Sequence, residues 1–257
     1  MQASRVTHTA YRWAAQFFDP RQILSAVRGL FWYWSDWRRY SALPGAERLS
    51  LLESYPQFHD RVGMTPLDAH YFYANGWAMR RILSQHPAQH VDIGSQTIFA
   101  NLLGATMPVV FVDYRPLAGG IEGVSRVGAS ILDLPMADRS LSSLSCLHVA
   151  EHIGLGRYGD PLDPLGTRKA ATELARVLAP SGNLFFAIPV GRPRVCFNAH
   201  RVHAPATVRE YFRSLELVEF SAVDDRGRYI ERPDMETVAG DRYACGLFWF
   251  RRPAVAG

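Results

Sequence analysis

The segment Cys146 to Pro164, CLHVAEHIGLGRYGDPLDP, gathers side chains that are suited to acid–base chemistry. His148 and His152 lie four residues apart with Glu151 between them, so a helical turn here would put both imidazoles on one face. Histidine is the side chain best suited to accept a proton near neutral pH. These three residues are the candidate catalytic groups. The alternatives are a structural role for His152, bonded to loop backbone, and a contact of Glu151 with a ligand's charge or with Arg157.

A second set of polar residues could bind a substrate. The loop GLGRYGDPLDPLG is either a rigid connection built from turns or a lid over a polyhydroxylated or anionic acceptor. Further polar residues follow the next apolar run and are expected on the same side. The candidate substrate-binding residues are Arg157, Tyr158, Asp160, Asn198, His200 and Arg201.

The sequence predicts neither a metal site nor a disulfide. His152, Asp160, His200 and His203 are of types that bind metals, but their separation is not typical of a ligand set. The three cysteines lie far apart without a CxxC pair. Cys146 and Cys196 are therefore expected to be buried apolar residues.

Three apolar runs, at residues 90–94, 109–113 and 141–147, must position these groups. Each reads as a buried strand and is followed by polar residues, and ligands of open α/β sheets lie beyond the carboxyl ends of the strands. Gly94 permits a tight turn, and Asp113 follows Asp92 by 21 positions, a spacing typical of a ribose-binding carboxylate. The GxGxxG pattern of dinucleotide enzymes is absent.

The remaining elements alternate in the same way. Helices are predicted at 68–85, 97–105, 167–180 and 206–215, with Asp68 as an N-cap and Pro180-Ser181-Gly182 as a stop. Further strands are predicted at 124–131, 183–191, 215–225 and 243–253. This alternation indicates a doubly wound, mainly parallel α/β sheet over residues 88–257, preceded by a helical extension over residues 1–87.

Over roughly residues 88–252 the chain resembles the class I S-adenosylmethionine-dependent methyltransferases. The resemblance rests on VDIGS, VVFVDYRP, DLPMADRSLSSLSCLHVAEHI and ELARVLAPSGNLFFAIPV, and on a final pair of strands that fits the antiparallel seventh strand. It implies a seven-stranded Rossmann-like sheet and S-adenosylmethionine as cofactor. The cofactor-binding residues that it implies are Asp92, Gly94, Ser95, Asp113, Ser130 and Asp133.

The resemblance also leaves alternatives open. Ser95 and Gln96 stand where the family has further glycines, and Ser130 where it often has an acidic residue, with Asp133 three positions on. The runs EHIGLGRYGDPLDP and FNAHRVH are most similar to an uncharacterised group, a domain of unknown function. The expected reaction is methyl transfer to an oxygen of a small or glycan-type acceptor. The alternatives are a degenerate fold that binds a ligand or partner, and a sugar- or nucleotide-modifying enzyme.

The N-terminal segment differs in character. Residues 1–48 hold seven arginines against three acidic residues, and the stripe Ile23, Val27, Leu30, Phe31 and Trp34 is typical of an amphipathic helix. The stripe either packs on the domain or a partner subunit, or lies on a membrane surface; nucleic-acid binding is not expected. No signal peptide or spanning run is visible, so we expect a cytoplasmic protein, with contact at the inner face of the membrane as the alternative.

Overall fold

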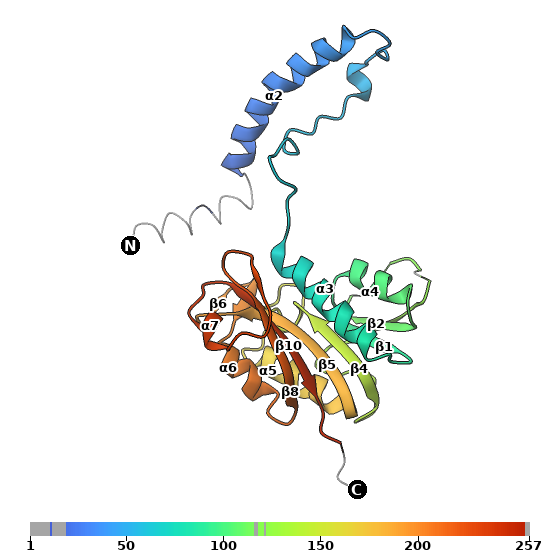
Figure 1. The fold of residues 1–257 in the computed structure, drawn as a ribbon, viewed down its shortest axis with the longest axis vertical. Coiled ribbons are helices and arrows are strands. Elements are labelled where there is room, and N and C mark those ends of the chain that lie inside the picture. Colours follow the sequence, from blue (N-terminus) through green and yellow to red (C-terminus); the bar gives the residue numbers. More distant parts are fainter. Residues whose placement is uncertain (1–10, 12–18, 116–117, 121, 255–257) are drawn as a thin grey trace. The chain divides into compact units, whose positions relative to one another are not determined.

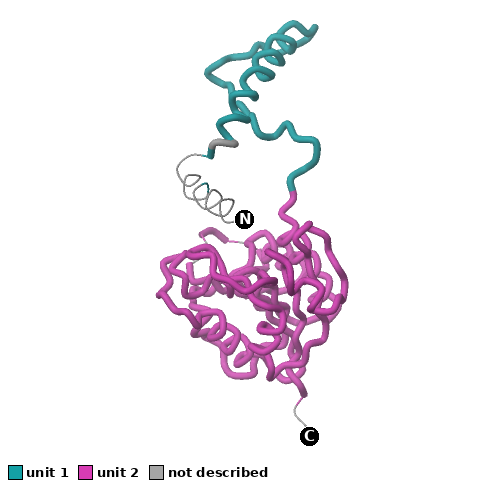
Figure 2. The backbone as a smooth tube through the Cα atoms, turned by 90° about the vertical axis from the view of Figure 1, so that its left-hand side faces the viewer, with its two compact units in different colours: residues 1–66 teal, residues 67–257 magenta. Residues whose placement is uncertain are grey.

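The structure, a computed structural model, describes Tyr11 and residues 19–115, 118–120 and 122–254. The chain divides into two compact units, residues 1–66 and 67–257 (Figure 2). The boundary expected near residue 87 differs from this division. Helix α3 (Ala69–Ser84) belongs to the larger unit, because Trp77, Ala78 and Ile82 on its buried face pack in that unit's core.

The larger unit is built on one eight-stranded sheet with the order β3-β2-β1-β4-β5-β10-β8-β9. The first five strands in this order are parallel, whereas β10 is antiparallel to both of its neighbours. The doubly wound, mainly parallel sheet is confirmed, and the two-residue β9 adds an edge strand to the seven that were predicted. The strands are β1 His90–Ile93, β2 Val109–Asp113, β3 Val124–Gly128, β4 Leu141–Leu147, β5 Leu178–Val190, β8 Glu216–Val223, β9 Tyr229–Ile230 and β10 Ala244–Arg251.

Helices cover both faces of the sheet (Figure 1). α3 and α4 (Thr97–Gly104) share one core with Phe185, and α5 (Gly166–Val177) and α6 (Pro205–Tyr211) share the other with Phe186. Because consecutive strand residues point to opposite faces, the β5 run fills both cores. Full burial of each phenylalanine stabilises the fold by about 1.5–3 kcal/mol. The short α7 (Glu236–Ala239) precedes β10.

The start of α3 is fixed by its predicted cap. Asp68 Oδ1 accepts hydrogen bonds from the backbone N–H of His70 at 3.1 Å and of Tyr71 at 3.4 Å. Such a cap stabilises a helix by about 1 kcal/mol. It also fixes the backbone of His70 and Tyr71, two residues in the first turn that line the site described below.

One local prediction was wrong, and one small hairpin was not predicted. The predicted stop Pro180-Ser181-Gly182 lies inside β5, because α5 ends at Val177 and the chain enters the strand at once. Pairing with β4 is irregular there, and a Cβ atom on Gly182 would lie 2.7 Å from the Leu141 carbonyl oxygen. The loop after β5 also forms a small hairpin, β6 (Arg194–Cys196) with β7 (His200–Val202), which the sequence did not predict.

The smaller unit contains α2 (Pro20–Ser41) and a short 3-10 helix, Leu51–Glu53. The returning segment packs Phe58 against Trp32 and Tyr33 on one side of α2, where a Cβ on Gly29 would lie 2.6 Å from Phe58 Cβ. The predicted apolar stripe lies elsewhere on the helix and is exposed: Ile23, Val27, Leu30, Phe31 and Trp34. None of the described helices has the length and apolar character to cross a membrane. Arg5, Arg12 and most of the run YRWAAQFF lie outside the described residues.

Candidate active site

The candidate site lies at the carboxyl ends of the parallel strands. Ala244, the first residue of β10, pairs with Val190 at the end of β5, because the two strands are antiparallel. The start of β10 therefore lies at the same edge of the sheet as the ends of β1, β2 and β4. The first turn of α3 joins this edge, since Tyr71 contacts His148 with ring centroids 4.9 Å apart.

Gly94 and Asp113 approach each other at the ends of β1 and β2. Gly94 has a φ of +63°, and a Cβ atom there would lie 3.7 Å from Asp113 Oδ2 and 3.3 Å from Val149 Cγ1. Asp113 Oδ1 accepts a hydrogen bond from the Arg115 N–H at 2.7 Å, so Oδ2 is the oxygen on the glycine side. A glycine beside a carboxylate leaves room for a ribose and provides an acceptor for its hydroxyls.

Asp92 and Ser95 are bonded to the protein itself. Asp92 is fully buried and accepts hydrogen bonds from Ser95 Oγ at 2.7 Å, from the Ser95 N–H at 3.1 Å and from Ser145 Oγ. Ser95 Oγ accepts in turn from the Leu147 N–H at 3.1 Å. Burial raises the pKa of Asp92 to about 6. These two predicted cofactor residues join the end of β1 to β4.

His90 extends the same buried network. Its ring nitrogens lie 2.8 Å from Ser143 Oγ and 2.8 Å from Ser145 Oγ. Because Ser145 donates its proton to Asp92, it must accept from His90 Nε2, which leaves Nδ1 to accept from Ser143. Burial lowers the pKa of His90 to about 3, so the ring is neutral.

Ser130 and Asp133 form a turn after β3. Ser130 Oγ accepts a hydrogen bond from the Leu132 N–H at 3.2 Å, and the Ser130 carbonyl accepts from the Asp133 N–H at 3.0 Å. The Asp133 side chain is exposed. The hydroxyl of Ser130 thus serves the turn itself.

His148 is buried and uses both of its ring nitrogens within the protein. Nδ1 lies 3.2 Å from Glu151 Oε1, and Nε2 lies 3.3 Å from Cys245 Sγ. Burial alone would lower the pKa of His148, but the interactions with Cys245 and Glu151 outweigh it and raise that pKa to about 10. No nitrogen of this ring is left to accept a proton from an acceptor, so a direct role as base does not fit these contacts.

Glu151 is the charged centre of the site. It is 1% exposed, and its Oε2 has no hydrogen-bond partner among the described residues. Burial opposes its ionisation, but the hydrogen bond and charge of His148 outweigh that and lower the pKa of Glu151. Burial and the Glu151 charge together raise the pKa of Tyr71 to about 12, and they also raise the pKa of Tyr243.

His152 lies near the same oxygen of Glu151 as His148. Its Nδ1 lies 2.5 Å from the Ala199 carbonyl oxygen, which can only accept, so Nδ1 carries the proton. Nε2 lies 3.8 Å from Glu151 Oε1. The backbone bond of the structural alternative is present, and it leaves Nε2 as the nitrogen suited to accept a proton.

Aromatic rings surround this pair. Tyr243 stacks on His70 at 4.9 Å and lies 4.8 Å from His200 between ring centroids. Burial is the main cause that lowers the pKa of His70 to about 4. Burial also lowers the pKa of His200. Of the predicted substrate residues, His200 is thus brought to the cluster. The sequence reasoning missed His70, Tyr71, Tyr243 and Cys245, although the predicted N-cap and antiparallel final strand were signals that could have found them.

The loop after β4 reaches across to the residues that follow β2. The Arg115 guanidinium lies 4.3 Å from the centroid of the Tyr158 ring, and the Arg157 guanidinium lies 5.2 Å from it. Arg157 also donates to the Ala199 carbonyl at 3.1 Å. Two predicted substrate residues, Arg157 and Tyr158, therefore lie between the Asp113 side and the His152 side of the site.

The other predicted substrate residues serve the loop or lie at the surface. Asp160 accepts from the N–H groups of Gly154 at 2.6 Å and Tyr158 at 3.3 Å. The buried Arg201 donates to the carbonyls of Ile153 at 2.5 Å and Asp163 at 2.9 Å. These contacts favour the rigid-connection interpretation of the loop. Asn198 is exposed on the β6–β7 hairpin.

Comparison with solved structures identifies the fold. The N-methyltransferase NodS from Bradyrhizobium japonicum WM9 matches with a TM-score of 0.51 and 20% identity, over 72% of this chain and 98% of that one. The [4+2]-cyclase SpnF matches with a TM-score of 0.53 and 15% identity, over 70% and 80%. The 1,6-didemethyltoxoflavin-N1-methyltransferase of Burkholderia thailandensis, with bound 1,6-didemethyltoxoflavin and S-adenosylhomocysteine, matches with a TM-score of 0.50 and 16% identity, over 72% and 79%.

Sequence comparison does not indicate a function. A family model described as a Caenorhabditis protein of unknown function, DUF268, matches residues 138–234, a range that includes EHIGLGRYGDPLDP. No curated protein matches the chain in sequence. The structural matches show the Rossmann-like fold of class I methyltransferases, as predicted. Because one of them is named a cyclase, the reaction must be argued from the site.

Proposed function

We propose that this protein is an S-adenosylmethionine-dependent methyltransferase that methylates an oxygen of a small or glycan-type acceptor. One observation carries the proposal. The Gly94–Asp113 pair lies on one side of the point where the strand order reverses, between β1 and β4, and the Glu151-centred group lies on the other. That reversal is where ligands of open α/β sheets bind.

The residues at the β1–β2 side fit the cofactor in part. Asp113 Oδ2 faces Gly94, where it would accept hydrogen bonds from the ribose hydroxyls. Asn75 on α3 donates to Gln96 Oε1 at 2.8 Å, while its own Oδ1 is buried and has no hydrogen-bond partner in the part of the chain that the structure describes. A buried unpaired acceptor is costly unless a donor reaches it, and the methionine ammonium would be such a donor.

When bound, S-adenosylmethionine supplies an electrophilic methyl group for in-line displacement by the acceptor oxygen. The protein must remove the acceptor's proton. His152 Nε2 is suited to take it, because Ala199 holds the ring with its proton on Nδ1. Glu151 Oε1, 3.8 Å away, then stabilises the positive imidazolium that forms.

The rings around this base support an acceptor with hydroxyl groups. Tyr243 is 37% exposed, and His200 and Tyr71 are partly exposed, so each offers a ring face and a polar edge. Arg157 provides a further donor at the surface. Aromatic faces with a few well-placed polar groups are typical of small-molecule sites.

A second function, a ligand- or partner-binding module without turnover, is favoured by other contacts. Asp92 and Ser95 are bonded to each other, and Val149 lies against Gly94, where the family has an open glycine-rich turn.

Calorimetric titration of the full chain with S-adenosylmethionine and S-adenosylhomocysteine tests both functions. We expect one site whose affinity falls at least about tenfold in Asp113→Asn, through loss of a charge-assisted hydrogen bond.

The matched control is Asp234→Asn, which changes an exposed carboxylate in the loop before α7 and should bind as the wild type does. Absence of heat with either ligand in the wild type would rule out the methyltransferase. Tight binding without transfer to any acceptor would instead favour the binding module.

We also propose that the exposed stripe on α2 lies on an anionic membrane surface. A groove on this helix is lined by apolar residues and by Arg38 and Arg39. Phe31 is 76% exposed and Trp34 is 41% exposed. Aromatic residues flanked by arginines are typical of helices that lie at the headgroup level, and a second copy of the chain is the alternative partner.

A further inference from the structure

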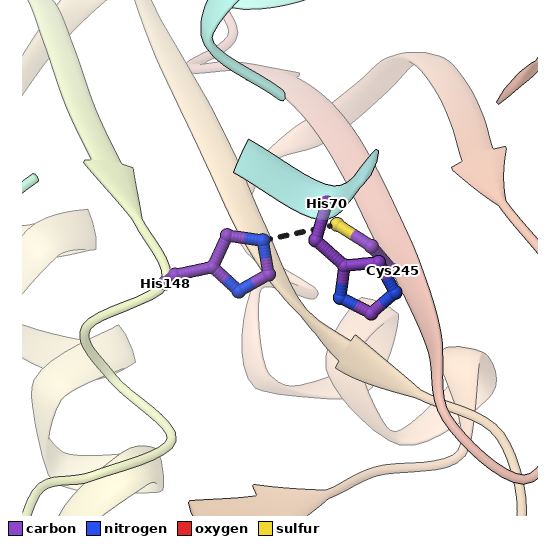
Figure 3. A group of neighbouring side chains, drawn as sticks. All are labelled: His70, His148 and Cys245. Atoms are coloured by element: carbon purple, nitrogen blue, oxygen red, sulfur yellow. Dashed lines mark hydrogen bonds between the residues drawn. The ribbon is translucent and has the colours of Figure 1, made fainter. Parts of the chain in front are cut away.

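Three side chains from separate elements meet at the buried edge of the site. They are His70 in the first turn of α3, His148 after β4 and Cys245 in β10 (Figure 3). One nitrogen of each ring and the Cys245 sulfur all lie within 4.8 Å of one another. His148 Nε2 and Cys245 Sγ are 3.3 Å apart. The elements of the fold thus bring two imidazoles and a thiol together from distant parts of the chain.

The surroundings hold these rings in one orientation. His148 Nδ1 contacts Glu151 Oε1 at 3.2 Å, and a carboxylate on the outer nitrogen is the arrangement that metal-binding histidines usually have. The His70 ring lies between the rings of His148, at 5.6 Å, and Tyr243, at 4.9 Å. Packing therefore fixes both imidazoles beside the sulfur.

The carboxylate behind His148 is itself buried. Glu151 is 1% exposed, and its Oε2 has no partner among the residues that the structure describes. Cys245 is fully buried a short distance away, on the other side of the His148 ring. A buried carboxylate is costly unless positive charge balances it, and the His148 ring on Oε1 can carry that charge either as a proton or as a bound dication.

The donor set selects the metal. Imidazole and thiolate suit Zn²⁺, whereas Mg²⁺ and Ca²⁺ require oxygen ligands. Zinc bonds of roughly 2.0–2.3 Å in a tetrahedral site put neighbouring ligand atoms about 3.5 Å apart. The sulfur and His148 Nε2 already meet this spacing, and the nitrogen of the partly exposed His70 needs to move by up to about 1.3 Å. An open pocket lined by His70 and Tyr243 reaches one of the three proposed ligands from solvent.

We propose that His70, His148 and Cys245 bind one Zn²⁺ ion, with Glu151 as the positioning residue on the outer nitrogen of His148. Three protein ligands leave a fourth tetrahedral position for water or another ligand, as in zinc sites that take part in chemistry. The proposal does not depend on methyl transfer. The competing arrangement is a hydrogen-bonded thiol–imidazole pair that takes no metal.

The test is titration of the chelator-treated full chain with Co²⁺, followed by Zn²⁺. We expect one equivalent of Co²⁺ to bind, with visible bands of a tetrahedral site and a near-ultraviolet sulfur-to-cobalt charge-transfer band, and Zn²⁺ to abolish both. Cys245→Ser should lose the charge-transfer band. Cys196→Ser, which changes a cysteine on β6, should keep it.

Two further variants keep the test decisive. Glu151→Gln should retain the charge-transfer band but weaken metal binding about 10–100-fold, which a bystander carboxylate would not do. Circular dichroism shows whether Cys245→Ser folds. If it does not, His70→Asn takes its place in the test, and this variant should bind the metal more weakly than the wild type. Substoichiometric Co²⁺ without a charge-transfer band in the wild type would overturn the proposal, as would equal bands in the two cysteine variants. The metal titration contains no S-adenosylmethionine. A protein that failed to bind S-adenosylmethionine would therefore still give the same result in the metal titration.

Discussion

His148 and His152 both lie near Oε1 of Glu151, yet their other contacts differ. His148 has both ring nitrogens engaged, by Glu151 and Cys245, whereas His152 makes hydrogen-bond contacts with the described residues through Nδ1 alone, to Ala199 and Arg157. The sequence predicted that a helical turn would put both rings on one face. The structure has a positive φ of 58° at His148 instead, so the chain leaves β4 through a tight turn, and both rings still lie near Oε1 of Glu151.

This difference predicts that removal of the His152 ring affects turnover and not cofactor binding. His152→Ala should lower kcat by roughly 10²–10⁴-fold, since a positioned general base contributes that much, and should leave cofactor affinity unchanged. Rates with a hydroxyl acceptor and calorimetric cofactor binding, measured on the same samples, separate the two effects. His59→Ala in the smaller unit serves as control, and equal loss of affinity and rate in His152→Ala would count against the assignment.

The buried network below the site predicts a pH dependence of stability. The pKa of His90 is about 3 in the folded protein and close to 6.5 when the residue is solvated. A depressed histidine pKa gives stability that is present above pH 6.5 and is lost as the pH falls toward 3. Asp92 acts in the opposite direction, since its raised pKa of about 6 makes the folded state take up a proton on acidification.

His90→Gln removes the pH-dependent stability that comes from His90 and keeps that from Asp92. The free energy of unfolding of this variant, relative to the wild type, should rise as the pH falls from 6.5 to 4, by up to about 1.4 kcal/mol per pH unit. Urea unfolding at a series of pH values measures it. A difference that does not change with pH would show that His90 is not the neutral buried group described here.

At the scale of elements, two segments complete a site that the parallel strands only begin. β10 brings Tyr243 and Cys245 to the carboxyl edge because it runs antiparallel to β5. α3 brings His70 and Tyr71 because Asp68 caps it at that edge. Neither segment was predicted to carry site residues, since the pairing of β10 and the packing of α3 are long-range properties that no local pattern reports.

The exposed stripe on α2 gives a prediction for the smaller unit. Phe31→Asp should reduce co-sedimentation of the full chain with anionic liposomes, because it puts a charge where an apolar ring would enter the headgroup region. Leu52→Asp is a matched control, since Leu52 is 95% exposed on the 3-10 helix and lies outside the stripe. No difference between the variants, or a loss of dimer mass in Phe31→Asp by light scattering, would point away from the membrane.

At the scale of the whole molecule, local sequence patterns predicted most of the fold. The bounds of β4 are Leu141–Leu147 as predicted, and α3 starts at its predicted cap, because buried runs and caps are signals of a few consecutive residues. The break between α5 and β5 was misplaced, because the Pro-x-Gly signal lies in a strand irregularity and not at a helix end.

The site was predicted in outline only. The sequence pointed to Gly94, Asp113, Glu151 and His152, which end strands or follow them directly, and the structure brings Gly94 to Asp113 and Glu151 to His152. It could not show that Asp92, Ser95, Asp160 and Arg201 are bonded within the protein. Side chains of the same types bind ligands or backbone according to which atoms face them, and that is decided by tertiary packing.

The proposed function requires the ribose of S-adenosylmethionine to bind beside Gly94 on Asp113. The most direct measurement is a crystal structure of the full chain with S-adenosylhomocysteine. We expect both ribose hydroxyls within hydrogen-bond distance of the Asp113 carboxylate, with the Val149 side chain displaced from its contact with Gly94. A nucleoside bound elsewhere, or Val149 in place and no ligand density beside Asp113 at saturating concentration, would contradict the account.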